Sequence, residues 1–329
     1  MTDDFSGRQL CALALCAMIA PAVQYCAAVP WPWVLAAAAL AAAYYIYIAC
    51  MGGRLPQHLE PTAVARFALG RTGGAMTLGL AWLWTVLAAA AVCRGSVSAF
   101  PDARAFPLVP LVALYLAWRA ADGGEAVVCR TGGVLVLPVL ALLAAALAFG
   151  TKNVTAANLV PSGSWRDAAG PFAVFLLPSG VFALRRVEKG SGAVGWFLTG
   201  TFLAAACSVV TIGCLGAPLA AASENAFYLM SKSVSVFGVM ERFEVLASAA
   251  LMLSRTCLLA VLLAQGARLG KELLPVLPPR GGAAAAALAA FGLLWVVPAV
   301  PTTVLFWGGV VFWGFLPAVL LGVASLKKV

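Results

Sequence analysis

The stretch that decides the fold is Phe172-Ala-Val-Phe-Leu-Leu177-Pro178-Ser179-Gly180-Val181-Phe-Ala-Leu184. It is apolar except for the Pro-Ser-Gly step at its centre, which removes a backbone hydrogen bond and has low helix propensity. Lipid cannot satisfy the freed N–H and C=O groups, so such a break must face protein or a water-filled cavity. We expect the helix to open at Leu177–Gly180, with the N–H groups near Gly180 and Val181 suited to a carboxylate and Ser179 adding a hydroxyl. The alternative is a simple proline kink.

A similar interruption lies in the first apolar segment, which contains Met18-Ile-Ala20-Pro21-Ala22-Val-Gln24-Tyr25-Cys26. Pro21 disfavours ideal helix geometry in the residues just before it, and Gln24 and Tyr25 add polar groups one turn later. Broken helices at matching places in two halves of a membrane protein mark a small-molecule site. We therefore expect the backbone around Ala20–Ala22 to contribute to that site, the alternative again being a kink.

The composition places this chain in a membrane. Of its 329 residues, 63% are hydrophobic and 10% are charged, and the mean hydropathy is +0.99, whereas a soluble domain carries roughly 25% charged residues. The acidic start, Met1–Arg8, has no basic region or cleavage site, so no signal peptide is predicted. The net charge of +9 comes from Lys and Arg at the ends of apolar spans and does not indicate nucleic-acid binding.

The hydropathy pattern predicts an all-α membrane protein with ten transmembrane helices in one integral membrane domain, 1–329. The predicted spans are 9–28, 32–51, 74–99, 106–120, 131–150, 169–186, 193–217, 240–268, 283–300 and 302–325. The polar linker Thr151–Ala168 separates five spans (1–150) from five (169–325), which is the arrangement of an inverted repeat with helices 1 and 6 broken. A second polar stretch, Ser223–Val239, is predicted to form a short surface helix.

The distribution of Lys and Arg predicts the orientation, because cytoplasmic loops carry an excess of these residues. With the N-terminus inside, fourteen of the 21 fall in inner segments, four fall in outer loops, and three lie within or at the edge of spans. We therefore expect a multi-pass protein with both termini in the cytoplasm.

Two arginines fall inside predicted spans, Arg94 in the third and Arg255 in the eighth, which occupy equivalent places in the two halves. An arginine at this depth usually faces a cavity or a partner, and Arg255 is the stronger candidate because Arg94 is close enough to the outer end to reach water. No acidic residue lies deep in a span. The nine cysteines form no CxxC pair and His58 is the only histidine, so no metal, cofactor or catalytic constellation is expected, and the protein is not expected to be an enzyme.

Three sequence segments resemble the GerAB-type spore germination family. The run Phe227-Tyr-Leu-Met-Ser-Lys-Ser-Val-Ser-Val-Phe-Gly-Val-Met-Glu241-Arg242-Phe-Glu244-Val-Leu is similar to the family's stretch before the eighth span, which ends in a Glu-Arg-hydrophobic-Glu signature. Leu69-Gly70-Arg-Thr-Gly73-Gly74 resembles its Leu-Gly-Lys-x-x-Gly, and Asn158-Leu-Val-Pro161 resembles its Asn-Leu-Leu-Pro. Length and spacing agree along nearly the whole chain. In place of the glycine common at the first break in the wider superfamily, this chain has Ala-Pro-Ala.

The resemblance implies a LeuT-like fold of the amino acid–polyamine–organocation transporter superfamily. It further implies the membrane B subunit of a spore germinant receptor, which binds a small nutrient, most often an amino acid such as alanine. Such a subunit works with A and C subunits in the inner spore membrane; a bacterial cell membrane is the alternative location. Two other functions remain open: an amino acid permease with net transport, and a structural membrane partner with a vestigial pocket.

Replacing Gly180 by leucine separates the binding functions from the vestigial pocket. The larger side chain should abolish ligand binding or uptake in a receptor or permease, because glycine there permits close approach of ligand and backbone. The measurement is uptake of labelled alanine and mixed amino acids into proteoliposomes under an imposed proton gradient. If the wild type binds or takes up the amino acids and the Gly180→Leu variant does so equally well, the result contradicts a site at Gly180.

Overall fold

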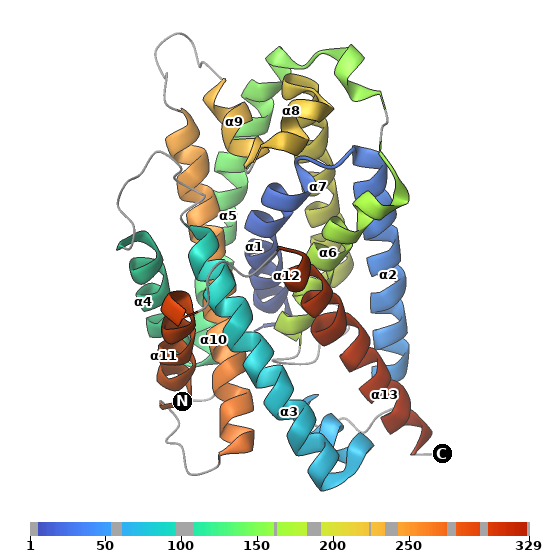
Figure 1. Ribbon diagram of the computed structural model, residues 1–329, viewed down its shortest axis with the longest axis vertical. Helices are drawn as coiled ribbons and strands as arrows, with labels where there is room; N and C mark the ends of the chain where they lie inside the picture. The colour runs from blue at the N-terminus through green and yellow to red at the C-terminus, as the bar shows by residue number, and fades with distance from the viewer. Residues whose placement is uncertain are drawn as a thin grey trace.

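The first helix, α1 (Gly7–Cys26), lies at the centre of the helical bundle (Figure 1). It starts at a capping box, in which the Ser6 hydroxyl accepts from the Gln9 N–H at 3.3 Å and the Gln9 side chain accepts from the Ser6 N–H at 3.1 Å. Every residue from Leu10 to Val23 is buried, because α1 packs against α5, α6, α7 and α10. A helix that is apolar all round suits a buried position or a membrane span.

This computed structural model describes residues 6–53, 61–96, 108–160, 163–182, 192–223, 225–233, 243–274, 281–296 and 302–327. All the regular structure of these residues is helical. The longer helices after α1 are α2 (Trp31–Gly53), α3 (Pro61–Gly95), α4 (Leu108–Asp122), α5 (Glu125–Gly150), α6 (Ala169–Phe182), α7 (Ala193–Leu215), α10 (Phe243–Leu273), α11 (Gly281–Val296) and α13 (Leu316–Leu326). The short helices are α8 (Ala217–Ala222), α9 (Ala226–Lys232) and α12 (Thr302–Gly309), and a π-helical segment, Val310–Phe315, joins α12 to α13.

Each of the ten predicted apolar segments overlaps one of these helices or, for the last segment, the run from α12 to α13. Within the described residues, seven helical stretches are long and apolar enough to cross a membrane. They are α1, α2, α3, α5, α7, α10 and the stretch Trp307–Leu326. The predicted class, an all-α integral membrane protein, is therefore confirmed. As described, α4, α6 and α11 have 15, 14 and 16 residues, fewer than the roughly 20 that a helix needs to cross the hydrocarbon core.

The predicted opening of the first and sixth helices is wrong for the residues described. The first, α1, is helical from Gly7 through Pro21 to Cys26, and α6 is helical through Pro178 to Phe182. A proline removes one N–H but leaves the remaining backbone bonds of a helix available, and both prolines are buried. The segment 183–191, where a second half-helix was expected to continue, lies outside the described residues.

A true change of direction occurs in α3 at Gly70, in the Leu-Gly-Arg-Thr-Gly-Gly motif. Its φ is 76° and its ψ is −178°, a conformation open essentially to glycine alone. Helix α3 begins at Pro61, earlier than the predicted third span (74–99). Gly70 divides it into a short first part and the long membrane helix. Arg66 in the first part forms an ion pair with Glu272 at the end of α10, at 3.2 Å.

Two polar stretches differ from expectation in detail. The linker after α5 forms three short 3-10 turns, Thr151–Asn153, Ala156–Leu159 and Trp165–Ala168, and within the middle turn the Asn158 amide donates to the Gly213 carbonyl of α7 at 3.0 Å. The predicted surface helix in Ser223–Val239 is observed as α9, but Phe227 and Met230 are fully buried, so this helix is part of the packed bundle. Residues 234–242, with Glu241 and Arg242, lie outside the described part of the chain.

The contact between α1 and α5 depends on a single glycine, Gly132. A Cβ added there would lie 2.8 Å from the Leu13 Cα and 2.4 Å from its Cδ1, so the two helix backbones would have to separate. At the next residue, Gly133, an added Cβ would meet only the Gln9 Cγ at 3.8 Å, an ordinary van der Waals distance. Small residues permit this close approach of helices in membranes.

Gly132→Ala should lower the stability of the fold, and Gly133→Ala is its matched control on the same helix. Overpacking of this kind costs about 1–3 kcal/mol, whereas alanine in an uncrowded helix position is neutral or stabilising by up to about 1 kcal/mol. The measurement is the thermal unfolding midpoint of each purified variant in the same detergent. Equal midpoints for the two variants would show that the α1–α5 contact is looser than described.

Candidate functional site

The candidate site is a cavity of about 90 Å³ between α1, α3, α6, α10 and the segment that joins α12 to α13. One water needs roughly 10–15 Å³ on this scale, so the cavity has room for several waters or one small organic molecule. Its polar lining comes mainly from Gln24 and Tyr25 of α1 and Arg255 of α10. Most of the rest of the lining is apolar, as is usual for small-molecule sites.

Arg255 is the central polar residue of this cavity. Its side chain is 3% exposed, and its Nη2 donates to the Gln24 Oε1 at 2.7 Å while its Nη1 donates to the Gly95 carbonyl. Gly95 is the last residue of α3, where helix carbonyls have no partner within the helix. Arg255 therefore caps the C-terminal end of α3, where a positive charge is favourable, and links it to α1.

The residue before Arg255, Ser254, fixes α1 beside the cavity. Its hydroxyl donates to the Cys16 carbonyl at 2.6 Å and accepts from the Ala20 N–H at 2.8 Å, the two groups that pair with each other in an undisturbed α-helix. One residue further, Pro21 has no N–H to donate to Ala17. The backbone hydrogen bonding of α1 thus differs from that of a regular helix at Ala20 and at Pro21. The side chains of Gln24 and Tyr25, one turn further along, line the cavity.

An aromatic wall closes the cavity on the side of α3 and α12. Trp84 stacks on Phe312 with ring centroids 5.3 Å apart and planes 9° apart, and it meets Trp313 edge to face at 5.7 Å. Gly308 makes this possible, because a Cβ there would lie 2.1 Å from the Trp84 ring. The π-helical segment places Trp313 in the wall, and the Tyr44 hydroxyl of α2 donates to the Trp313 carbonyl at 2.8 Å.

The sixth helix contributes an apolar surface. Ala173, Val174 and Leu177 line the cavity. The Tyr45 hydroxyl of α2 donates to the Phe175 carbonyl at 2.8 Å, in the turn before Pro178. Tyr44 and Tyr45, which are neighbours in α2, thus donate to one carbonyl in the π-helical segment and to one in the turn before Pro178.

The structure brings together some of the residues predicted for the site. Pro21, Gln24, Tyr25, Leu177 and Arg255 line one cavity.

The other predicted residues do not reach this cavity, or their positions there are not described. Ala20 and Ala22 are buried and are not among the described lining residues, and the Ala20 N–H donates to Ser254; a role of this backbone in holding a ligand stays a prediction. Pro178 is buried and Arg94 is exposed, and neither is among the described lining residues. The backbone of Ser179, Gly180 and Val181 is helical, and their side chains lie outside the description.

Side chains of the third and eighth spans were expected to close the pocket, but the individual wall residues of α3 and of the last helices were not predicted from the sequence. Trp84, Ala88 and Val92 come from the third helix, and Gly309 and Trp313 from the last. One signal was available: tryptophan is enriched at membrane interfaces, so Trp84 in the interior of an apolar helix was unusual. Ala88 and Val92 resemble any other apolar position and gave no signal.

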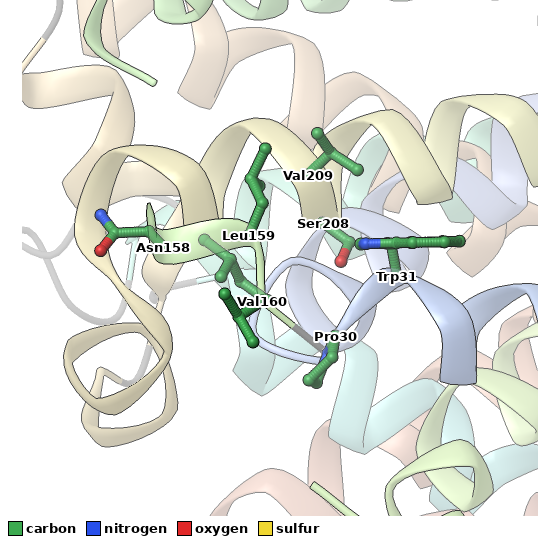
Figure 2. A pocket seen from close by; sticks show the side chains of 8 residues that line it. Pro30, Trp31, Asn158, Leu159, Val160, Ser208 and Val209 are labelled. Carbon is green, nitrogen blue, oxygen red and sulfur yellow. The ribbon is translucent and has the colours of Figure 1, made fainter. Parts of the chain in front are cut away.

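A second hollow lies near the surface between the start of α2, the Ala156–Leu159 turn and α7 (Figure 2). Its volume is about 10 Å³, which is space for about one water. Among the residues labelled in Figure 2, the Ser208 hydroxyl already donates to the Val29 carbonyl. This hollow is therefore too small for a ligand larger than about one water.

Within the described residues, no group of three or more His, Cys, Asp or Glu side chains is arranged to hold a metal ion. The thiols of Cys16 and Cys257 lie 3.5 Å apart between α1 and α10, and both are buried. Buried cysteines of this kind act as small packing residues.

The fold and cavity define the class: a helical integral membrane protein with a small, largely apolar cavity that contains a buried arginine. Comparison with protein-family models and with curated proteins found no match.

Ser254→Ala should destabilise the protein, and Ser248→Ala on the same helix is the matched control. Both serines are buried, but Ser254 makes two hydrogen bonds to α1, whereas the Ser248 hydroxyl has no hydrogen-bond partner among the described residues. Loss of buried hydrogen bonds should cost about 1–3 kcal/mol at Ser254 and close to nothing at Ser248. Thermal unfolding midpoints in detergent measure both; equal effects would show that the Ser254 bridge does not stabilise α1.

Proposed function

We propose that this protein is the B-subunit type of a spore germinant receptor, in which the cavity beside Arg255 binds a small amino-acid-like molecule through its carboxylate. The observation that carries the proposal is the buried guanidinium of Arg255, which lines a cavity between α1, α3, α6 and α10 and is positioned by Gln24 and Gly95. The resemblance of the Gly70, Asn158 and Glu241–Glu244 segments to the GerAB-type family supports the receptor assignment.

The cost of burying an arginine in a membrane protein supports a functional role for Arg255. A charged side chain at mid-depth in a span is unfavourable by roughly 2.5–3.5 kcal/mol or more, and such residues usually face a cavity or pathway. The C-terminal end of α3 favours a positive charge, and the guanidinium that caps it also lines the cavity. A guanidinium matches a carboxylate in both charge and geometry, and forms two parallel hydrogen bonds with it.

The helix contacts support a five-plus-five inverted repeat with a LeuT-like arrangement. Exchange of the halves relates α1 to α6, α2 to α7, α3 to α10, α4 to α11, and α5 to the α12–α13 run. Contacts found in one half recur in the other: α1 packs on α5 and α6 on α12, α1 on α7 and α6 on α2, and α10 on α4 and α3 on α11. The helix pairs α1–α6, α2–α7, α3–α10 and α4–α11, which the exchange maps onto themselves, are also in contact.

In this proposal the protein acts as a receptor that signals by a population shift. A carboxylate bound to Arg255 competes with Gln24 and Gly95 for the guanidinium, so it changes the connection between α1, α3 and α10. Binding can favour one arrangement of these helices only through such a difference in affinity between two states. The A and C subunits of the receptor would detect the change at the bundle surface, with both termini in the cytoplasm.

Net transport is the main alternative use of the same site, and one experiment separates the two. Purified protein is tested for binding of labelled L-amino acids, and proteoliposomes are tested for uptake of the same compounds under an imposed proton gradient. Saturable binding without uptake supports the receptor, and uptake makes the protein a permease. A folded protein that binds none of the panel contradicts the proposal and favours a structural role.

Arg255→Gln should weaken binding of the amino acid by at least about tenfold, because a charge-assisted pair of hydrogen bonds contributes roughly 1.5–3 kcal/mol. Arg94→Gln removes the same charge from an exposed position at the end of α3 and should bind like the wild type. Equilibrium dialysis with the labelled compound measures both, after size-exclusion chromatography has established that each variant is folded.

A second variant tests the same site without replacing Arg255, so that a folding defect of Arg255→Gln does not decide the result. Ala91→Leu adds volume to the cavity lining from α3 and leaves the residues of the guanidinium network in place, and should also weaken binding. Binding at wild-type affinity in both folded variants would place the ligand site elsewhere.

A further inference from the structure

The cavity is elongated along α3. The residues of this helix that line it are Trp84, Ala88, Ala91, Val92 and Gly95, which follow one face because residues three and four apart are neighbours on a helix. At a rise of about 1.5 Å per residue, Trp84 and Gly95 are separated by about 16 Å along the helix axis. The lining therefore extends over about three turns of α3.

The packing of α10 against α3 shows which parts of the cavity lie at its two ends. Arg255 of α10 donates to the carbonyl of Gly95, the last residue of α3. Further along α10, a Cβ added at Gly266 would lie 3.9 Å from the Thr85 Cγ2, in the first part of the lining face. The two helices are therefore antiparallel, and Arg255 and Trp84 belong to opposite ends of the cavity.

Polar groups gather at the Gly95 end. The Arg255 guanidinium binds the Gly95 carbonyl and the Gln24 side chain there, and Tyr25, the neighbour of Gln24 in α1, also lines the cavity. The proposed function places the carboxylate of the ligand at this end. The side chain of a bound amino acid then has the space toward Trp84 available to it.

The opposite end is formed mainly by apolar groups. The Trp84 ring meets Trp313 edge to face and closes the cavity on that side. Between this aromatic wall and Arg255, α3 contributes Ala88 and α10 contributes Leu258. Burial of an aliphatic group against such side chains is favourable in proportion to its area, and the small side chain of Ala88 leaves room for one.

The volume of the cavity indicates the size of the side chain that fits. The cavity measures about 90 Å³, which is space for roughly six to nine waters at about 10–15 Å³ each. A compact ligand such as alanine would leave the Trp84 end empty, and the side chains that line an empty space lose their contacts. An extended aliphatic side chain would reach along the cavity and fill that end.

We infer that the Trp84 end of the cavity is a subsite for the side chain of the ligand. The subsite takes an unbranched apolar side chain such as that of norleucine in preference to the methyl group of alanine, and Ala88 determines its length. This inference rests on the proposed function, because it places the carboxylate of the ligand at Arg255.

The first experiment measures the Kd of four amino acids on the wild-type protein in detergent. L-alanine, L-2-aminobutyrate, L-norvaline and L-norleucine differ by one methylene at each step, and equilibrium dialysis against empty micelles corrects for partitioning. Each buried methylene should tighten binding about threefold, so that norleucine binds about twentyfold or more tightly than alanine.

Ala88→Leu tests the residue that determines the length of the subsite. The larger side chain fills the Trp84 end, and should weaken norleucine binding about tenfold or more while alanine binding stays within about twofold of the wild type. Ala91→Leu is the matched control on the same helix, one turn nearer to Gly95. It adds the same side chain closer to the carboxylate of the ligand and should weaken binding of both amino acids.

The outcomes separate the inference from the proposed function. If the wild type binds alanine as tightly as norleucine, the inference is wrong, while amino acid binding stands. If folded Ala88→Leu weakens alanine and norleucine binding equally, the assignment of length to Ala88 is overturned; if this variant does not fold, the wild-type series still decides whether the subsite exists. A folded wild type that binds none of the four contradicts the inference and the proposed function together.

Discussion

The attachment of α1 to α10 is the interaction on which the cavity depends. Pro21 deprives α1 of one N–H, and lipid offers no replacement for an unpaired backbone group. The hydroxyl of Ser254 bridges the Cys16 carbonyl and the Ala20 N–H at the same place, and the next residue, Arg255, holds Gln24 one turn further along α1. Two consecutive residues of α10 thus fix both the irregular turn of α1 and the polar side chains beyond it.

The same constraint explains the tyrosines of α2. Pro178 in α6 and the π-helical segment after α12 both disturb the regular pairing of backbone carbonyls. The hydroxyls of Tyr44 and Tyr45 donate to carbonyls in these two segments, those of Trp313 and Phe175. In each of these irregular segments beside the cavity, one carbonyl therefore accepts a hydrogen bond from a hydroxyl of α2. These bonds allow the helices to continue without a break.

Hydropathy was sufficient to predict the helices, because an apolar segment of the right length has one solution in lipid. The prediction erred at Pro21 and Pro178, where local propensity indicated a break but tertiary partners such as Ser254 keep the helix intact. Arg255, Gln24 and Tyr25 could be identified as site residues because polar groups are rare in apolar spans. Trp84 and Trp313 could not be assigned to one wall, since their meeting depends on Gly308 and on the packing of α3 against α12.

The position of Arg255 joins a structural role to the ligand-binding role that we propose for it. Two of its acceptors, the Gln24 amide and the Gly95 carbonyl, are neutral groups on two different helices. A carboxylate makes stronger, charge-assisted hydrogen bonds to a guanidinium than neutral acceptors do. Under the proposed function, a carboxylate ligand at this position would compete with the contacts that join α1, α3 and α10, and would couple occupation of the cavity to the arrangement of these three helices through one side chain.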